Sequence, residues 1–236
     1  LEGLHTELRA LGQMVIVSIT RAIGALRQQD VAAAKQVIEE DNRIDQAQYR
    51  LEEHALVVMA TQQPMARDLR RIVAAIEIAS ELERIGDYAK GIAKITVRQG
   101  DTPLAKPLMD IPQMAEQAIT MLGSALDAYV NEDADAARRL SNADDTVDDL
   151  VSRMRAGLIE LIQSDPSTTA RSVDLLFVTH NLERIADRTT NIAARVILIA
   201  SGDIVDLNPI LCASNQQGSD DSAWVVVVSS EFSGID

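Results

Sequence analysis

An internal repeat is the sequence feature that most constrains how this chain can fold. Residues 83–87 read Glu-Arg-Ile-Gly-Asp, and residues 183–187 read Glu-Arg-Ile-Ala-Asp. Further matched positions are Ile92 with Ile192, Ala93 with Ala193, Asp41 with Asp144, Ile44 with Val147 and Asp45 with Asp148. The matches lie 100 or 103 residues apart, which indicates two copies of one supersecondary unit that pack against each other.

Each half reads as three long helices. Apolar residues recur at steps of three and four, the period of an amphipathic helix. Gln-Gln-Pro at 62–64 and Gln-Ser-Asp-Pro at 163–166 interrupt the pattern at matching places in the two halves. Asp30 is expected to cap the second helix. The six expected helices span about residues 1–28, 30–60, 66–98, 112–130, 133–163 and the stretch that follows Pro166 up to residue 200.

We therefore predict an all-α fold of six long helices in two duplicated halves, each with the order helix, helix, Pro loop, helix. The first repeat is expected at residues 1–100 and the second at residues 101–202, with a Gly- and Pro-rich boundary between them. Residues 203–236 match neither repeat and are rich in Ser, Asp and Asn. We expect this tail to be disordered; the alternative is that Trp-Val-Val-Val-Val at 224–228 forms a strand or binds a partner.

Composition excludes several classes of function. Hydrophobic residues make up 47% of the 236 residues but aromatic residues only 3%, so the core must be aliphatic, and binding of RNA or single-stranded DNA through stacked bases is excluded. The formal net charge of −14 repels phosphate backbones and anionic lipid, and it favours cations as ligands. One cysteine, Cys212, permits no disulfide framework. No apolar run approaches the roughly 20 residues of a membrane span, so we expect a cytoplasmic protein.

The residues that could carry chemistry are acidic pairs spaced four apart. On a helix, positions i and i+4 share one face, and two helices that each present such a pair would gather four carboxylates. Carboxylate oxygens suit hard cations such as Mg²⁺, Ca²⁺, Mn²⁺ or oxidised iron. The alternative is that the pairs are solvated and bridged by Arg43, Arg84, Lys90, Arg184 or Arg188. The candidate metal ligands are Asp41, Asp45, Glu83, Asp87, Asp144, Asp148, Glu183 and Asp187.

Two details of these pairs are left open by the sequence. In the fifth helix, Asp145 and Asp149 form a second acidic pair that overlaps Asp144 and Asp148, so the register there is ambiguous by one residue. His180 reads as an ordinary helix residue; the alternative is that, three residues before Glu183, it supports this residue from outside the site.

Signatures of enzymes are missing. The chain has no GxxxxGK[ST], GxGxxG or HExxH motif. A ferritin-like di-iron centre needs Glu-x-x-His on two helices, and the single match is at residues 2–5. Cys212 has no neighbouring base. We therefore predict no catalytic residue and no organic cofactor.

The motifs resemble those of the PhoU family of phosphate-system regulators. The resemblance is carried by residues 62–70 and 81–87 in the first half, and by residues 181–187 and 191–193 in the second. It implies a fold of two pseudo-symmetric three-helix bundles. It also implies multinuclear metal clusters on the acidic pairs, of iron or zinc, with magnesium or manganese as alternatives. Family members often have His after the Asp of the motif, whereas this chain has Tyr88 and Arg188.

The resemblance also implies a function. It predicts a non-enzymatic, homodimeric negative regulator of phosphate uptake that acts in the cytoplasm, at the inner face of the membrane through its partners. Those partners would be a phosphate ABC transporter and the sensor histidine kinase of the phosphate regulon. No basic cradle for phosphate is visible, so indirect sensing is expected. The alternatives are a carboxylate-bridged metalloenzyme, such as an oxidase or phosphohydrolase, and a plain helical scaffold.

Overall fold

The structure, a computed structural model, describes residues 2–100 and 110–207 and consists of six long helices in these ranges, with no strand there. The all-α prediction is confirmed, and the helix ends lie within a few residues of those expected. Most of the expected Gly- and Pro-rich boundary lies outside the described residues. Cys212 and residues 224–228 lie outside them entirely. The helices are α1 (Glu2–Gln28), α2 (Val31–Gln62), α3 (Ala66–Gln99), α4 (Ile111–Asn131), α5 (Ala134–Ser164) and α6 (Thr169–Ser201), the last preceded by the short 3₁₀ helix η2 (Pro166–Thr168).

The turns that start the second helix of each half have the same chemistry. Asp30 accepts a hydrogen bond from the Ala33 amide, as expected for an N-cap, and Asp133 accepts one from the Ala136 amide, both at 2.9 Å. The residue before each cap has positive φ, 56° at Gln29 and 50° at Glu132. The duplication therefore extends to turn geometry, and Asp133 caps α5 instead of forming its first turn.

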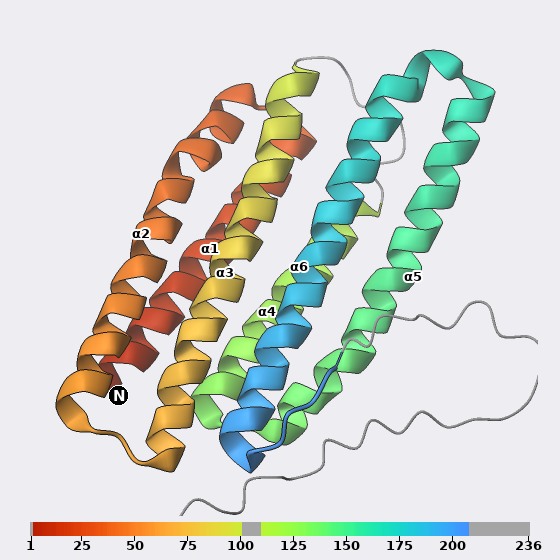
Figure 1. The fold of residues 1–236 in the computed structure, drawn as a ribbon. Helices are drawn as coiled ribbons and strands as arrows, with labels where there is room; N and C mark the ends of the chain where they lie inside the picture. The colour runs from red at the N-terminus through yellow and green to blue at the C-terminus, as the bar shows by residue number, and fades with distance from the viewer. Residues whose placement is uncertain (1, 101–109, 208–236) are drawn as a thin grey trace, which may run out of the picture.

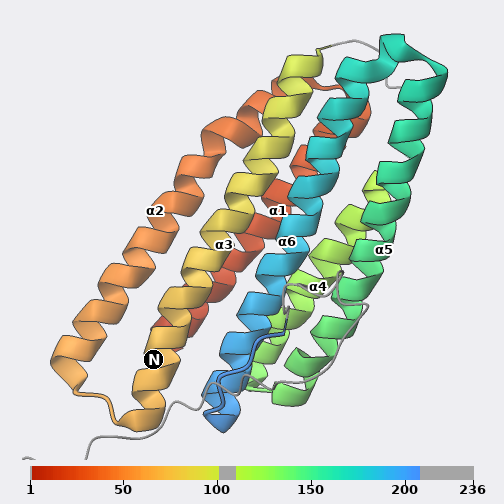
Figure 2. The ribbon, with the colours of Figure 1, turned by 45° about the vertical axis from the view of Figure 1, so that its right-hand side comes forward.

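The helices form two three-helix bundles that lie side by side. Figures 1 and 2 show α2, α3, α6 and α5 next to one another in that order, with α1 and α4 behind them. The halves meet where α3 packs on α6 and α1 packs on α4. Because Glu77 pairs with Arg195 at 3.1 Å and Arg98 pairs with Asp174, α3 and α6 run antiparallel. The core is aliphatic, as expected, with Tyr129 as the fully buried ring among the described residues.

Helix packing within the two halves differs at one matched contact. A Cβ added to Gly86 of α3 would lie 3.1 Å from Cδ1 of Ile44 on α2. The matching residues of the second half are Ala186 and Val147, both buried. The first half thus pairs glycine with isoleucine, and the second pairs alanine with the smaller valine. The total side-chain volume at this contact is therefore similar in the two halves.

One ion-pair group fastens the turn before α5 to the start of α3. The Glu132 carboxylate accepts hydrogen bonds from Arg67 and Arg71, each at 2.6 Å. Burial disfavours the charge of Glu132, but the hydrogen bonds from Arg67 and Arg71 outweigh it and lower its pKa. This contact joins the two halves of the chain away from the α3–α6 seam.

Helix α1 corrects one expectation from the sequence. By length and composition alone it could cross a membrane, although half of its apolar stretch is buried inside the bundle. It packs against α2, α3 and α4, and contacts with three neighbours require apolar residues on more than one side of the helix. After α6, the described residues 203–207 are not helical, yet Val205 and Leu207 pack against the core.

Candidate functional site

The eight predicted ligands fall into two acidic sites, one in each half. We call them the first acidic site (Asp41 and Asp45 on α2, Glu83 and Asp87 on α3) and the second acidic site (Asp144 and Asp148 on α5, Glu183 and Asp187 on α6). In each half the two helices pack directly on each other. The structure therefore brings together the pairs that the sequence placed on separate helices.

In the first acidic site a lysine from α3 binds both helices. Lys90 Nζ donates to Oδ2 of Asp41 at 2.5 Å and to Oδ1 of Asp87 at 3.3 Å. The Asp41 side chain is only 2% exposed, whereas that of Lys90 is 26% exposed. The nearly buried carboxylate is thus neutralised within the protein, and the hydrogen bond to Asp41 raises the pKa of Lys90.

The other two carboxylates of this site are less well compensated. Burial, and then the charge of Asp41, raise the pKa of Asp45. Burial, and then the charges of Asp87 and Asp45, raise the pKa of Glu83. The mutual effects agree with four carboxylates that face one another across the α2–α3 contact.

The second acidic site lacks a lysine at the matching position. That position is Thr190, whose hydroxyl donates to the backbone carbonyl of Asp187 at 2.8 Å. Asp144 is 6% exposed, and its Oδ1 atom is buried without a hydrogen-bond partner. Burial, followed by the charges of Asp187 and Asp148, raises the pKa of Asp144 to about 7. A buried carboxylate oxygen without a donor is costly unless a proton or a cation satisfies it.

The structure resolves the register of the acidic pair in α5. Asp144 is buried, and Asp148 has its pKa raised by burial and then by the charge of Glu183 on α6. Asp148 is exposed to solvent, as are Asp145 and Asp149, so the register is fixed by the burial of Asp144 and by the charge of Glu183 at Asp148. The pair that faces α6 is therefore Asp144 with Asp148.

An arginine and a histidine side chain lie at the border of the second acidic site. Arg184 donates to Oδ2 of Asp187 at 3.3 Å, and the ring of His180 lies 3.4 Å from Oε2 of Glu183. His180 thus contacts Glu183, the arrangement that the alternative interpretation of this histidine requires. Neither side chain bonds to Asp144.

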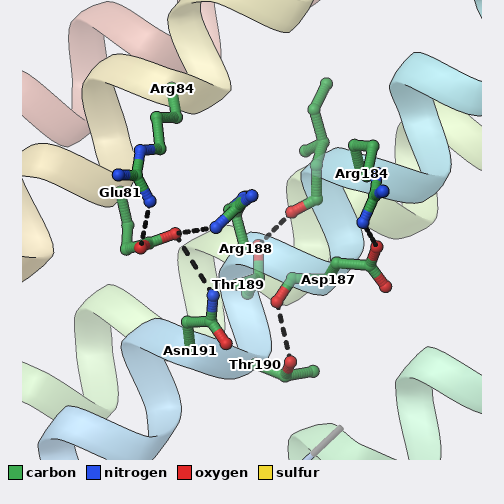
Figure 3. Close-up of polar contacts among 9 residues, drawn as sticks. Glu81, Arg84, Arg184, Asp187, Arg188, Thr189, Thr190 and Asn191 are labelled. Carbon is green, nitrogen blue, oxygen red and sulfur yellow. Dashed lines mark hydrogen bonds and ion pairs between the residues drawn. The ribbon is translucent and has the colours of Figure 1, made fainter. Parts of the chain in front are cut away.

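A polar cluster at the α3–α6 seam was not found from the sequence. Figure 3 shows Glu81 of α3 as its centre: the carboxylate accepts hydrogen bonds from Arg84 at 3.2 Å, Arg188 at 3.4 Å and Asn191 at 3.3 Å. Arg188 therefore faces the other half of the chain and not the second acidic site. Glu81 lies two residues before the repeated motif and could have been noticed there. Only the antiparallel packing of α3 on α6 shows that Glu81 lies opposite Asn191.

The two sites differ in how well they fit a metal ion. Across residues 2–100 and 110–207, no three His, Cys, Asp or Glu side chains are arranged so that they could hold one ion. Uncompensated carboxylates repel one another, so side chains would have to rotate to converge on a cation. The second acidic site fits a hard cation, because it carries several negative charges and the buried Oδ1 atom of Asp144 has no hydrogen-bond partner. In the first acidic site, Lys90 already provides a positive charge.

Comparison with known proteins shows the same duplication. The PhoU domain model matches the chain twice, at residues 8–96 and 111–196. The chain belongs to the PhoU family. The repeats found from residues 83–87 and 183–187 are thus the two PhoU domains, and the predicted family is confirmed.

Curated relatives of this family align along most of the chain. A phosphate-specific transport system accessory protein PhoU homolog of Clostridium acetobutylicum is 37% identical over 88% of this chain and 95% of its own length. Homologs of the same description from Rhizobium meliloti and Streptococcus pneumoniae are 32% and 30% identical. These names describe an accessory protein and not an enzyme, in agreement with the prediction of a non-enzymatic protein.

Solved structures of the PhoU family have the same fold. The phosphate transport system regulatory protein PhoU from Streptococcus pneumoniae superimposes with a TM-score of 0.81 at 28% identity, over 87% of this chain and 97% of that chain. PhoU from Pseudomonas aeruginosa superimposes with a TM-score of 0.80 at 31% identity, over 86% of this chain and 97% of that chain. The six-helix architecture is therefore that of the family.

Proposed function

We propose that this chain is a regulatory accessory protein of phosphate transport that links a phosphate ABC transporter to a sensor histidine kinase. The observation that carries the proposal is the match of the PhoU model to both halves of the chain, with relatives named as accessory proteins of phosphate-specific transport. The absence of enzyme motifs from the sequence supports an adaptor over a metalloenzyme. The link to the kinase and the homodimer rest on the family resemblance.

The charge of the chain supports binding to basic protein surfaces. With a formal net charge of −14, the protein is attracted to positively charged faces of partners, and such complementarity speeds encounter. In this proposal the chain is cytoplasmic and reaches the inner face of the membrane only through the transporter and the kinase. Phosphate status is then sensed through the partners.

Metal binding is the second part of the proposal. The acidic residues would hold iron, zinc, magnesium or manganese, and the metal would supply positive charge between helices, not catalysis. For the second acidic site, the ligands would be Asp144, Asp148, Glu183 and Asp187. Neutralising carboxylates that repel one another stabilises the fold, so a chelator should lower the melting temperature of a metal-loaded sample.

A pull-down with purified transporter and kinase components tests the adaptor function. The full chain is used as bait, once loaded with metal and once treated with chelator. Binding of both partners is the expected result, and failure to bind either partner with metal present would overturn the proposal. As a matched pair, the double variant Asp144→Asn/Asp148→Asn tests whether the second acidic site supports binding, and Asp145→Asn/Asp149→Asn removes the same charge from the exposed register.

A further inference from the structure

We propose that the two acidic sites are not equivalent: Lys90 acts as the built-in cation of the first, and only the second binds a metal ion. The inference rests on the metal-binding part of the proposed function and makes it specific to one half of the chain. It follows from a difference between matched residues, Lys90 on α3 and Thr190 on α6.

In the first acidic site the ammonium group bonds to both helices. Lys90 Nζ lies 2.5 Å from Oδ2 of Asp41 and 3.3 Å from Oδ1 of Asp87. A divalent cation that used these two carboxylates would have to displace the ammonium or lie beside it. Displacement would leave a half-buried charge without its partners, and coexistence would place like charges within a few ångströms, where repulsion is strong in a partly buried site. The lysine therefore excludes the metal.

The Gly86 contact holds Asp41 near this position. Because Gly86 has no side chain, α2 approaches α3 closely, and a Cβ at Gly86 would lie 3.7 Å from Oδ1 of Asp41. The carboxylate is thus confined between the helix backbone on one side and Lys90 on the other. This leaves Asp41 little freedom to turn toward a different cation.

In the second acidic site the matching side chain is short and bears no charge. Thr190 bonds to its own helix, and Asp144 has a buried Oδ1 atom without a hydrogen-bond partner. Arg184 and His180 bond to Asp187 and Glu183, and neither bonds to Asp144. Asp144 is 6% exposed, and among residues 2–100 and 110–207 no cationic side chain bonds to its carboxylate. A divalent cation would supply the missing positive charge.

Exchange of the two matched residues tests the inference. Metal-free full chain is titrated with Mn²⁺ alone and with Zn²⁺ alone, and the metal bound per chain is counted after gel filtration. The double variant Asp144→Asn/Asp148→Asn should lose the metal that wild type binds, and Asp41→Asn/Asp45→Asn should keep it. Lys90→Thr should raise the metal content of the chain to that of two sites, and Thr190→Lys should abolish binding. Lys94→Thr, one turn further along α3 and exposed, removes the same charge without a contact to either site and should leave the metal content unchanged.

Three results would overturn the inference. They are a wild-type chain that binds neither metal, equal metal loss from the variants of the two sites, and a Lys90→Thr chain with unchanged metal content. Because Thr190 is buried and a lysine there could disturb folding, Lys90→Thr, at a half-buried position, is the decisive variant. Its melting temperature should also rise with Mn²⁺ by more than that of wild type. These measurements need no partner protein, so their failure is distinct from failure of the transporter and kinase pull-down.

Discussion

Lys90 of α3 donates a hydrogen bond to Asp41 of α2 across 2.5 Å, and the carboxylate it neutralises is almost completely buried. This one contact decides what the first acidic site can do. It stabilises the α2–α3 packing without any ligand, and in our proposal it takes the place of a metal ion.

Removal of Lys90 should destabilise the protein. In Lys90→Met, Asp41 is left buried without its partner, and we expect a loss of about 2 kcal/mol in the free energy of unfolding, less than for a fully buried pair because the lysine is partly exposed. Chemical denaturation at pH 7 with a chelator present measures it. The double variant Asp41→Asn/Lys90→Met should recover part of the loss, and Lys94→Met should cost little. A double variant no more stable than Lys90→Met would contradict the pairing.

Asp144→Asn should stabilise the metal-free protein above neutral pH. The folded-state pKa is raised from the usual 3.8 to about 7, so the folded form holds its proton over a range where the unfolded form has lost it. Stability therefore falls as the pH rises through this range. The variant should gain roughly 4 kcal/mol at pH 8, because a tenfold change in proton affinity is worth about 1.4 kcal/mol, and almost nothing near pH 4. Thermal unfolding in the presence of a chelator measures the gain. Equal gains from exposed Asp145→Asn would argue against a local cause.

Glu132→Gln should show the opposite pH dependence. The pKa of Glu132 is lowered in the fold, so its ion pairs with Arg67 and Arg71 stabilise the protein above the ordinary value of 4.5 and are lost as the pH falls through the lowered pKa. We expect a cost of about 1 kcal/mol at pH 7, since both arginines are partly exposed. Unfolding curves of variant and wild type should converge in acid; a constant difference at all pH values would indicate a role other than the ion pairs.

Gly86 and Ile44 should be energetically coupled. Alanine has the higher helix propensity, but its Cβ would lie 3.1 Å from Ile44, so Gly86→Ala should be less favourable beside isoleucine than beside valine. The double variant Gly86→Ala/Ile44→Val copies Ala186 and Val147 of the other half. A double-mutant cycle of unfolding free energies should give a coupling of about 1 kcal/mol. Strict additivity would show that the close approach has no energetic weight.

Much of the fold could be predicted because its signals are local. The helix periods, the Pro breaks at residues 64 and 166 and the cap at Asp30 each depend on a few neighbouring residues. The repeat at residues 83–87 and 183–187 then required two similar units. The acidic residues could be located in the same way, because their spacing of four is a property of a single helix.

The sequence by itself determined the helices, the duplication and the eight carboxylates. Only the tertiary structure decided which charges meet. Lys90 and Asp41 are 49 residues apart in the chain, and Glu81 and Asn191 are 110 apart, so no local pattern relates them. The packing of α2 on α3 buries Asp41 against the ammonium group of Lys90. The packing of α5 on α6 buries Asp144 without an ammonium group beside it. Matched motifs thus acquire different electrostatics, because a charge is stabilised by what surrounds it in space and not by its neighbours in sequence.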